Sequence, residues 1–428
     1  WLLHLGAKME TPPWRIGFRN FLTSRSFEKV LTALSPYEVR TGRWRELVVK
    51  RGLLLDLSDV IFAEFATLAQ LALLVESATR HRITVTVALP ANQDVRGFMV
   101  RSGFIHAITM PHIKDSKNLP NIIEHRTALN DEFSKGEANN SIDSEFDVGD
   151  VEDYKFSNIF PLCWIDRSEG LEKDAFASFI LRHNELGLTE VDARAIAATI
   201  LFELVQNVTR HAAESDDVTG PPHALVGVIA LDPKQYSLRE KNYRPSMAGV
   251  INWCRRTQST IIRLIVGDSG KGIPSALSPF FKPENANEVP AIDRKLLKSE
   301  QLLFWSLNKW STSTPEAALS KRGTRGLWLV QRMVRSYGGC LLLRGDNAAI
   351  GLTYQDTDDP SYLYDRGVAY VKGSFLEAWI LPGDHTARKA STLQPKSRDL
   401  TGFEYLPITF DDSRGIALKS QQDLRDAL

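Results

Sequence analysis

The stretch Ala195–Ala213, which reads AIAATILFELVQNVTRHAA, is the feature that most constrains how this chain can fold. Its apolar residues recur at the spacing i, i+3, i+4, i+7 that is typical of the buried side of a helix; they are Leu201, Leu204, Val205 and Val208. Glu203, Asn207 and His211 recur every four residues and therefore share a second, polar side of the same helix. An amphipathic helix with a solvated polar side explains this stretch by itself, so any further role depends on motifs later in the chain.

The overall composition predicts a soluble, globular chain. A length of 428 residues leads us to expect two or three domains, and an apolar fraction of 43% is enough to form their cores. No run of about 18 uncharged apolar residues indicates a membrane span. Basic and acidic residues number 52 each, so binding to nucleic acid or to a membrane is not indicated. The cysteines Cys163, Cys254 and Cys340 match no metal-binding spacing, and we expect buried thiols in a reducing, cytoplasmic compartment.

The first part of the chain predicts a helical segment followed by a compact α/β unit. Residues 1–44 contain two helical-looking pieces broken by prolines. Alternation and helical periodicity then predict a strand at Leu47–Leu57, a helix at Phe62–Arg80, a strand at Ile83–Leu89 and a helix at Asn92–Ser102. Gly103 is the expected end of the last helix. Such an alternation covers one face of a sheet with helices.

This unit, placed at residues 45–125, resembles a STAS domain, the module of anti-sigma-factor antagonists and anion-transporter tails. The resemblance rests on the pattern LLLDLSDVIFAEFATLAQLALLVESA followed by ITVTVALPANQDVRGFMVRSGF. Regulatory STAS domains carry Asp-Ser-Ser-Gly at the start of their first helix, and one of these serines is phosphorylated. Here the corresponding stretch is Glu64-Phe65-Ala66-Thr67. The resemblance therefore implies a docking module for a protein partner without the phosphorylation switch, in which Thr67 is a buried or capping residue.

An acidic, polar stretch at residues 126–158 contains too few apolar residues to order itself, and we expect a linker or mobile loop. Apolar structure resumes beyond it. The predicted strands are Ile159–Ile165, Ala224–Leu231, Ala248–Trp253, Ile261–Gly267, Cys340–Arg344, Ile350–Tyr354, Val368–Lys372 and Phe375–Leu381, and the predicted helices are Gly170–Leu186, Ile292–Trp310 and Leu327–Tyr337. Residues 385–428 are predicted to be a polar tail in which GFEYLPITF is a short strand or a docking peptide, and Gln421–Leu428 carries no signal.

Three motifs in one order resemble those of the GHKL ATP-binding domain, whose superfamily includes gyrase B, heat-shock chaperones, MutL, histidine kinases and anti-sigma-factor kinases. Glu203–His211 (ELVQNVTRH) resembles the N-box, Asp268–Ile273 (DSGKGI) the adenine-binding box, and Gly323–Val330 (GTRGLWLV) the second glycine box. Trp328 stands where a glycine is typical, and the GLWLV wording resembles the anti-sigma-kinase branch. The resemblance covers residues 159–384 and implies an α/β fold in which a STAS-like α/β module is followed by a GHKL (Bergerat-type) α/β sandwich.

The resemblance also implies a site for ATP and Mg²⁺. An ionised Asp268 can only accept hydrogen bonds, so it would select the exocyclic amine of adenine over the carbonyl of guanine. The amide oxygen of Asn207 suits Mg²⁺, and Glu203, one turn away, can act as general base on a water beside the γ-phosphate. Gly326 opens a helix whose N–H groups and dipole suit a triphosphate. The other expected nucleotide-binding residues are His211, Gly270, Gly272, Ile273, Lys321, Gly323, Thr324, Arg325 and Leu327.

For His211, Lys321 and Arg325 a surface ion pair explains the residue equally well. The segment Ser278–Thr314 joins the second motif to the third, and it predicts either a lid over the nucleotide or a packed connecting helix. These alternatives remain open, because a motif match is a hypothesis that only its structural context can confirm.

Three functions agree with these motifs. The first is an ATP-hydrolysing switch that changes shape or dimerises with nucleotide and acts through a protein partner, and Glu203 favours it. The second is a protein kinase of the anti-sigma-factor or histidine-kinase type, favoured by GLWLV and by the STAS-like neighbour. The third is a scaffold that binds ATP without turnover. One superfamily hosts all three, so the fold alone does not choose among them.

Overall fold

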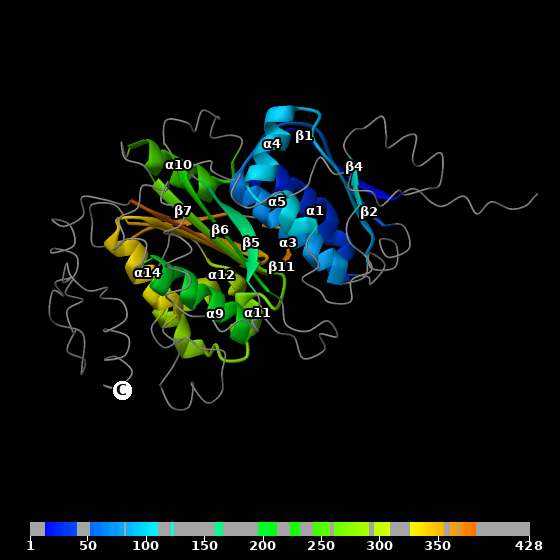
Figure 1. The fold of residues 1–428 in the computed structure, drawn as a ribbon. Coiled ribbons are helices and arrows are strands. Elements are labelled where there is room, and N and C mark those ends of the chain that lie inside the picture. The colour runs from blue at the N-terminus through cyan, green and yellow to red at the C-terminus, as the bar shows by residue number, and fades with distance from the viewer. Residues whose placement is uncertain are drawn as a thin grey trace, which may run out of the picture.

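The computed structural model describes residues 13–40, 52–80, 83–109, 121–123, 159–165, 196–211, 223–231, 243–256, 261–290, 295–308, 326–354, 360–365 and 368–381. Within them the chain is a mixed α/β protein with one parallel and one antiparallel sheet (Figure 1). The strands are β1 (Trp14–Leu22), β2 (Leu53–Ala63), β3 (Val85–Ala88), β4 (Asn121–Ile123), β5 (Ile159–Ile165), β6 (Ala224–Leu231), β7 (Ile261–Asp268), β8 (Cys340–Asp346), β9 (Ala348–Thr353), β10 (Ser361–Tyr364) and β11 (Val371–Ile380).

The helices connect and cover these strands. They are α1 (Ser24–Arg40), α3 (Phe65–Arg80), α4 (Gln93–Arg101), α5 (Phe104–Thr109), the π-helical turn η4 (Ile196–Leu201), α9 (Phe202–His211), α10 (Pro245–Arg256), α11 (Ile273–Leu277), the 3₁₀ turn η7 (Pro283–Glu288), α12 (Lys298–Trp305) and α14 (Gly326–Ser336). Among the described residues, no helix is long and apolar enough to cross a membrane.

The parallel sheet has the order β1-β2-β3-β4 and contains the predicted α/β unit. The predictions for α3, β3 and α4 are confirmed to within a few residues. Asn92 caps α4, because its Oδ1 accepts hydrogen bonds from the backbone N–H groups of Asp94 (2.9 Å) and Val95 (3.2 Å). Gly103 follows the helix with φ +74°, the left-handed conformation that glycine adopts at helix ends.

The prediction of helical structure throughout residues 1–44 is wrong for Trp14–Leu22. This segment is β1, which pairs with β2 and buries the alternating residues Ile16 and Phe18. Helix α1 follows it and continues through the predicted break at Pro36. The predicted strand Leu47–Leu57 is displaced, since β2 begins at Leu53, directly after Gly52 with φ +74°.

The antiparallel sheet has seven described strands in the order β10-β9-β8-β11-β7-β6-β5. The predictions for β5, β6, β7, β8 and β9 are confirmed. The predicted strand Ala248–Trp253 is wrong, because this segment belongs to helix α10. The two strands predicted at Val368–Lys372 and Phe375–Leu381 are one strand, β11, with an irregular register between Val371 and Ser374. The predicted linker, the predicted helix Gly170–Leu186 and the tail lie outside the described residues.

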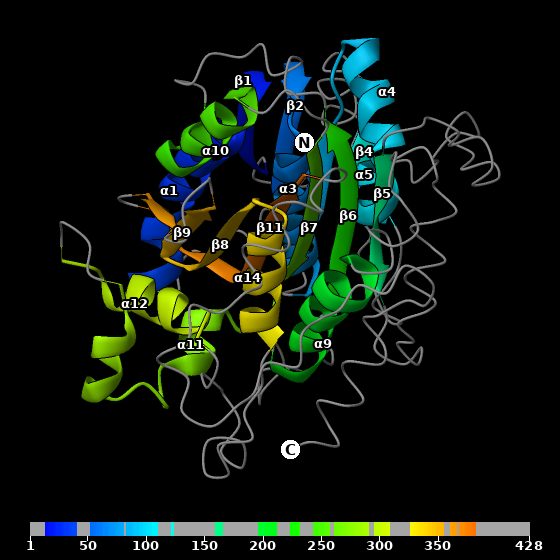
Figure 2. The ribbon, with the colours of Figure 1, turned by 90° about the vertical axis from the view of Figure 1, so that its left-hand side faces the viewer.

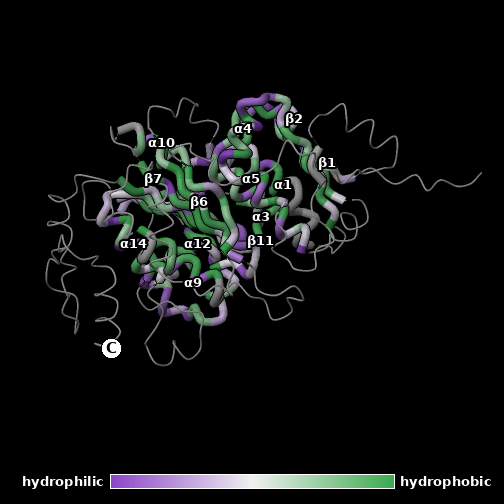
Figure 3. The backbone as a smooth tube through the Cα atoms, viewed as in Figure 1, coloured by the Kyte–Doolittle hydropathy of each residue, from purple (hydrophilic) through white to green (hydrophobic). Residues whose placement is uncertain are grey.

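Helices cover both faces of the antiparallel sheet. On one face, α9, α12 and α14 pack against alternate residues of the strands and form the first core, which includes Val205, Val226, Leu264, Phe304 and Val330. Helices α9 and α14 contact each other on this face, as Figure 2 shows. Strands β6 and β7 are mostly hydrophobic in composition (Figure 3), apart from the polar residues Arg263 and Asp268, and they are almost entirely buried, as expected for strands covered on both sides.

On the other face, α3 lies between the two sheets. A second core joins residues of α3 to β2 on one side and to β6, β7 and β11 on the other; it includes Leu55, Leu68, Leu225, Ile265 and Phe375. Glycines allow the helix to approach closely. A Cβ atom added to Gly227 would lie 2.8 Å from Cζ of Phe65, and one added to Gly267 would lie 2.6 Å from Cδ1 of Leu73. The parallel unit is therefore packed directly on the antiparallel sheet.

A buried ion-pair network reinforces this packing. Nη2 of Arg263 on β7 donates hydrogen bonds to Oε1 of Glu64 (2.9 Å), which precedes α3, and to Oε2 of Glu377 (2.6 Å) on β11. The guanidinium group lies 4.3 Å from the ring centroid of Trp379. Glu64 also accepts a hydrogen bond from Oγ1 of Thr67 (3.0 Å), and Thr67 is fully buried. The expectation that Thr67 is a buried or capping residue is confirmed.

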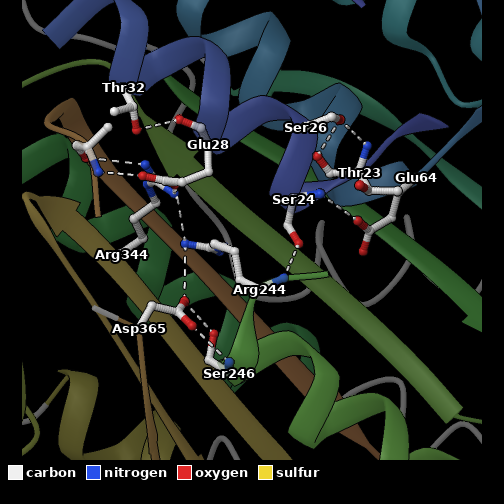
Figure 4. Close-up of polar contacts among 11 residues, drawn as sticks. Thr23, Ser24, Ser26, Glu28, Thr32, Glu64, Arg244, Ser246, Arg344 and Asp365 are labelled. Atoms are coloured by element: carbon white, nitrogen blue, oxygen red, sulfur yellow. Dashed lines mark hydrogen bonds and ion pairs between the residues drawn. The ribbon is translucent and has the colours of Figure 1, made fainter. Parts of the chain in front are cut away.

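A second polar network lies between α1 and the antiparallel sheet (Figure 4). Nη1 of Arg344 on β8 donates to Oε2 of Glu28 on α1 (2.5 Å). Nη1 of Arg244 lies 3.5 Å from Oδ2 of Asp365, which also accepts a hydrogen bond from Oγ of Ser246 (2.6 Å). Burial is the main reason that the pKa of Arg344 falls to about 10. Both networks place charged pairs, rather than isolated charges, between the two sheets.

Candidate functional site

The helix predicted within Ala195–Ala213 is present between Ile196 and His211. It starts as the π-helical turn η4 and continues as α9, and the apolar residues Leu204, Val205 and Val208 join the core under β6 and β7. Glu203 and Asn207 are half-buried on the polar side. The predicted division of the helix into an apolar and a polar side is therefore confirmed.

The start of α14 lies against this polar side. A Cβ atom added to Gly326 would lie 2.9 Å from Nδ2 and 3.0 Å from Oδ1 of Asn207, and 3.2 Å from Oε2 of Glu203. The first N–H groups of a helix have no partner within it and carry a partial positive charge. The fold thus brings a carboxylate, an amide and a helix N-terminus together from the first and third motifs. A larger residue at position 326 would displace the ends of these two side chains.

Asp268 of the second motif ends β7 on the same face of the sheet. Side chains alternate between the two faces of a strand, so Asp268 lies on the same face as Ile262, Leu264 and Val266. These three residues belong to the first core, which α9 also joins. Oδ1 of Asp268 accepts a hydrogen bond from the backbone N–H of Gly270 (2.8 Å). Asp268 as a residue is only 3% exposed. The second motif therefore forms a tight turn that holds its own carboxylate at the end of the strand.

The carboxyl group of Asp268 is less acidic than an exposed aspartate. Burial, the main cause, and the charge of Glu76 raise the pKa of Asp268 to about 7. Hydrogen bonds from the backbone N–H groups of Gly270 and Ser374 and the charge of Arg80 act in the opposite direction. A ligand that donates a hydrogen bond to this carboxylate would favour its ionised form.

Residues that the sequence argument missed complete the surroundings of the second motif. A Cβ atom added to Gly272 would lie 2.5 Å from Oδ1 of Asp346 at the end of β8, and 2.9 Å from the carbonyl oxygen of Gly373 on β11. Gly373 has φ +90°, and a Cβ atom there would lie 1.9 Å from the carbonyl oxygen of Asp268. Oγ of Ser374 accepts a hydrogen bond from the N–H of Ile273 (3.0 Å). Three strands therefore meet at this turn.

Two polar atoms at this turn have unused hydrogen-bonding capacity. In the described part of the chain, Oγ of Ser269 and Oδ1 of Asp346 are buried and form no hydrogen bond. Burial raises the pKa of Asp346, although Oγ of Ser275 donates a hydrogen bond to its Oδ2 (2.7 Å). Buried polar atoms without a partner are costly and need an explanation. A polar ligand at the turn, such as a purine with ring nitrogens and an amine, is compatible with these atoms.

The structure brings together some of the predicted site residues and does not describe others. Glu203, Asn207 and Gly326 meet, and Asp268, Gly270 and Gly272 form the turn described above; the side chains of Ile273 and Leu327 pack on the first core instead of standing apart from it. Lys321, Gly323, Thr324 and Arg325 lie outside the described residues, as does the side chain of His211. Their expected contacts with nucleotide stay predictions.

The segment between the second and third motifs packs as a connecting helix where it is described. The helix predicted at Ile292–Trp310 is shorter, because α12 runs from Lys298 to Trp305. Its residues Leu303 and Phe304 are buried in the first core. Among the two alternatives for this segment, α12 itself therefore supports the packed helix over a lid.

The described residues hold no cluster of three or more His, Cys, Asp or Glu side chains that would bind a metal on their own. Mg²⁺ commonly takes one or two protein ligands and completes its shell with phosphate oxygens and waters. The amide oxygen of Asn207 and the carboxylate of Glu203 are oxygen donors of this kind, and both lie against the start of α14. The residues present fit an ion that arrives together with a phosphate ligand.

Comparisons with protein families, with curated proteins and with solved structures found no match for this chain. The three motifs, and the places that the fold gives them, are therefore the basis on which a function can be proposed.

Proposed function

We propose that this chain binds Mg-ATP on the α9 face of the antiparallel sheet and uses ATP hydrolysis as a conformational switch that signals through a protein partner. The observation that carries the proposal is the meeting of Glu203 and Asn207 with Gly326 at the start of α14. In this proposal the parallel unit is a STAS-like module and the antiparallel sheet with α9, α12 and α14 is a GHKL (Bergerat-type) sandwich.

The turn after β7 is the proposed adenine end of the site. An ionised Asp268 would accept the hydrogen bond of the adenine amine, whereas guanine presents a carbonyl oxygen at that position. Oγ of Ser269, which is buried without a partner among the described residues, is available to a ring nitrogen or to a bridging water. Gly270 and Gly272 keep the turn free of side chains. These features support ATP over GTP.

The start of α14 is the proposed phosphate end. Its N–H groups and helix dipole favour a triphosphate, and Asn207 would contribute an oxygen ligand to Mg²⁺. The bound Mg²⁺ would neutralise phosphate charge. The carboxylate of Glu203 is next to both groups and is suited to orienting a water molecule and accepting its proton. This division of roles makes Glu203 the catalytic residue and Asn207 a binding residue.

The packing of α3 bears on the alternative that the chain is a kinase of the anti-sigma-factor type. The start of α3 corresponds to the phosphorylated region of regulatory STAS domains, but here Glu64 and Thr67 are buried on the face of the sheet opposite α9. The chain's own module is therefore poorly placed to accept phosphate from the proposed site. A kinase would have to act on a separate protein, and a protein partner would dock on a surface other than the start of α3.

Incubation with γ-labelled ATP and Mg²⁺ separates the three functions. We expect labelled inorganic phosphate to be released by the purified chain, and no label to remain on it. Label transferred to the chain or to an added protein would instead support the kinase, and intact ATP that co-elutes with the chain would support the scaffold. The double variant Glu203→Ala, Asn207→Ala serves as the control for contaminating ATPases, because a chain that lacks both the proposed base and the proposed Mg²⁺ ligand should not release phosphate.

A further inference from the structure

Helix α3 and strand β7 run side by side in the same direction. Near the start of the helix, Glu64 accepts a hydrogen bond from Arg263 (2.9 Å), and further along Leu73 packs on Gly267. A helix advances about 1.5 Å per residue and a strand about 3.3 Å. The nine residues from Glu64 to Leu73 and the four from Arg263 to Gly267 therefore span the same length, about 13 Å. The contacts at both ends fix the register of the helix on the strand.

This register places Glu76 level with Asp268. Glu76 lies one helical turn beyond Leu73, and Asp268 is the next strand residue after Gly267. Both carboxyl groups are buried, Glu76 being 2% and Asp268 3% exposed. Glu76 forms an ion pair with Arg80 on the next turn of α3. A carboxylate and a guanidinium group thus approach the end of β7 from the face opposite to α9.

We propose that Glu76 is a positioning residue of the nucleotide site, which opposes the ionisation of Asp268 and thereby sets the affinity for adenine. Two like charges in a buried environment repel more strongly than in water, so ionised Glu76 favours the neutral form of Asp268. The neutral form cannot accept the adenine amine at its hydroxyl oxygen as well as the carboxylate can. The parallel unit, which carries Glu76, would in this way tune a site on the other side of the sheet.

Charged residues also lie on the other described elements around the end of β7. They are Glu203 on α9, Asp346 on β8, Lys372 on β11 and Lys271 in the turn itself. Glu76 and Arg80 act on Asp268 with opposite signs, and the pKa of Asp268 lies at about 7. The inference has two parts. The first, that Glu76 opposes the ionisation of Asp268, concerns only groups of the chain itself. The second, that adenine affinity follows this balance, rests on the proposed function.

A carboxyl ¹³C NMR titration of the full chain without nucleotide tests the first part. The Asp268 signal is assigned by its absence in Asp268→Asn. Glu76→Gln should lower the pKa of Asp268 by about half a pH unit or more, and Arg80→Gln should raise it by a similar amount. Arg80→Lys keeps the charge and should leave the pKa of Asp268 unchanged.

Structural damage is told apart from the effect of charge by the sign of the shift. Glu76→Gln and Arg80→Gln break the same ion pair, so structural damage alone would shift the pKa in the same direction in both variants. Shifts of equal sign, or none, would overturn the inference.

The second part is tested by Mg-ATP affinity as a function of pH. For a pKa of about 7, only the ionised fraction binds well, so affinity should fall roughly tenfold from pH 8 to pH 6. In Glu76→Gln this fall should move to lower pH, and in Arg80→Gln to higher pH. If the NMR shifts appear and no variant binds ATP, the proposed function fails while the control of Asp268 by Glu76 stands. If ATP binds with no dependence on these substitutions, the coupling to nucleotide is wrong.

Discussion

Glu203→Ala should still bind Mg-ATP, but it should release phosphate about 10²–10⁴ times more slowly than the parent chain. The carboxylate is proposed to act on water and not to hold the nucleotide, so its removal leaves the contacts of the bound state in place. Equilibrium affinity and steady-state phosphate release, measured on the same preparation, separate the two effects. Glu203→Gln is the matched variant, because it keeps the shape beside Gly326 and cannot accept a proton. It should be as slow as Glu203→Ala.

Asn207→Ala should behave differently although it changes the same side of α9. Its oxygen is the proposed Mg²⁺ ligand, so Mg²⁺-dependent affinity itself should fall. General damage to the helix would affect both variants alike. Phosphate release by Glu203→Ala at the parent rate would show that Glu203 is not the base, and the proposed switch would lose its mechanism.

Arg263→Met should lower the free energy of unfolding by about 3–5 kcal/mol. The substitution keeps a long apolar stem next to Trp379 but leaves two buried carboxylates, Glu64 and Glu377, without the guanidinium group that pairs with both. Burial already raises the pKa of Glu377, and loss of Arg263 should raise it further. A carboxyl group whose pKa is higher in the folded state costs stability once the pH exceeds its unfolded value. The loss should therefore be larger at pH 7 than at pH 4.

Urea unfolding of the parent and variant at both pH values provides the measurement. Arg19→Met, an exposed arginine on β1, is the control and should change stability by about 0.5 kcal/mol or less. Adding Glu64→Gln and Glu377→Leu to Arg263→Met removes the stranded carboxylates and should restore most of the stability. If Arg263→Met is no less stable than Arg19→Met, the network does not hold the parallel unit on the sheet.

Periodicity in the sequence was sufficient where one face of an element is buried. The apolar side of α9 predicts its burial on the first core, and the nearly continuous apolar runs of β6 and β7 predict strands that are covered on both faces. Helix α10 was misassigned although its signal is present. Met247, Val250, Ile251 and Cys254 are spaced i, i+3, i+4, i+7 and are all buried, so the helical period outweighs the apparent strand.

The candidate site was predictable only in part, and for a physical reason. The motifs identify Glu203, Asn207 and Asp268 because each is next to its own turn or helix. Asp346 and Glu76 carry no local signal, since they reach the second motif through the pairing of β8, β11 and β7 and through the packing of α3. Such partners depend on long-range register, which the spacing of residues along the chain does not contain.

The central claim is that the turn after β7 recognises adenine. Isothermal titration calorimetry with ATP and with GTP, each with Mg²⁺ at pH 8, tests it most directly on the parent chain and on Asp268→Asn. We expect binding of ATP at least about tenfold tighter than of GTP, because a carboxylate next to the guanine carbonyl loses a hydrogen bond and leaves two acceptors facing each other. Asp268→Asn should remove most of this preference. Equal affinity for the two nucleotides, or a preference that survives in Asp268→Asn, would contradict the assignment of Asp268 and of the site.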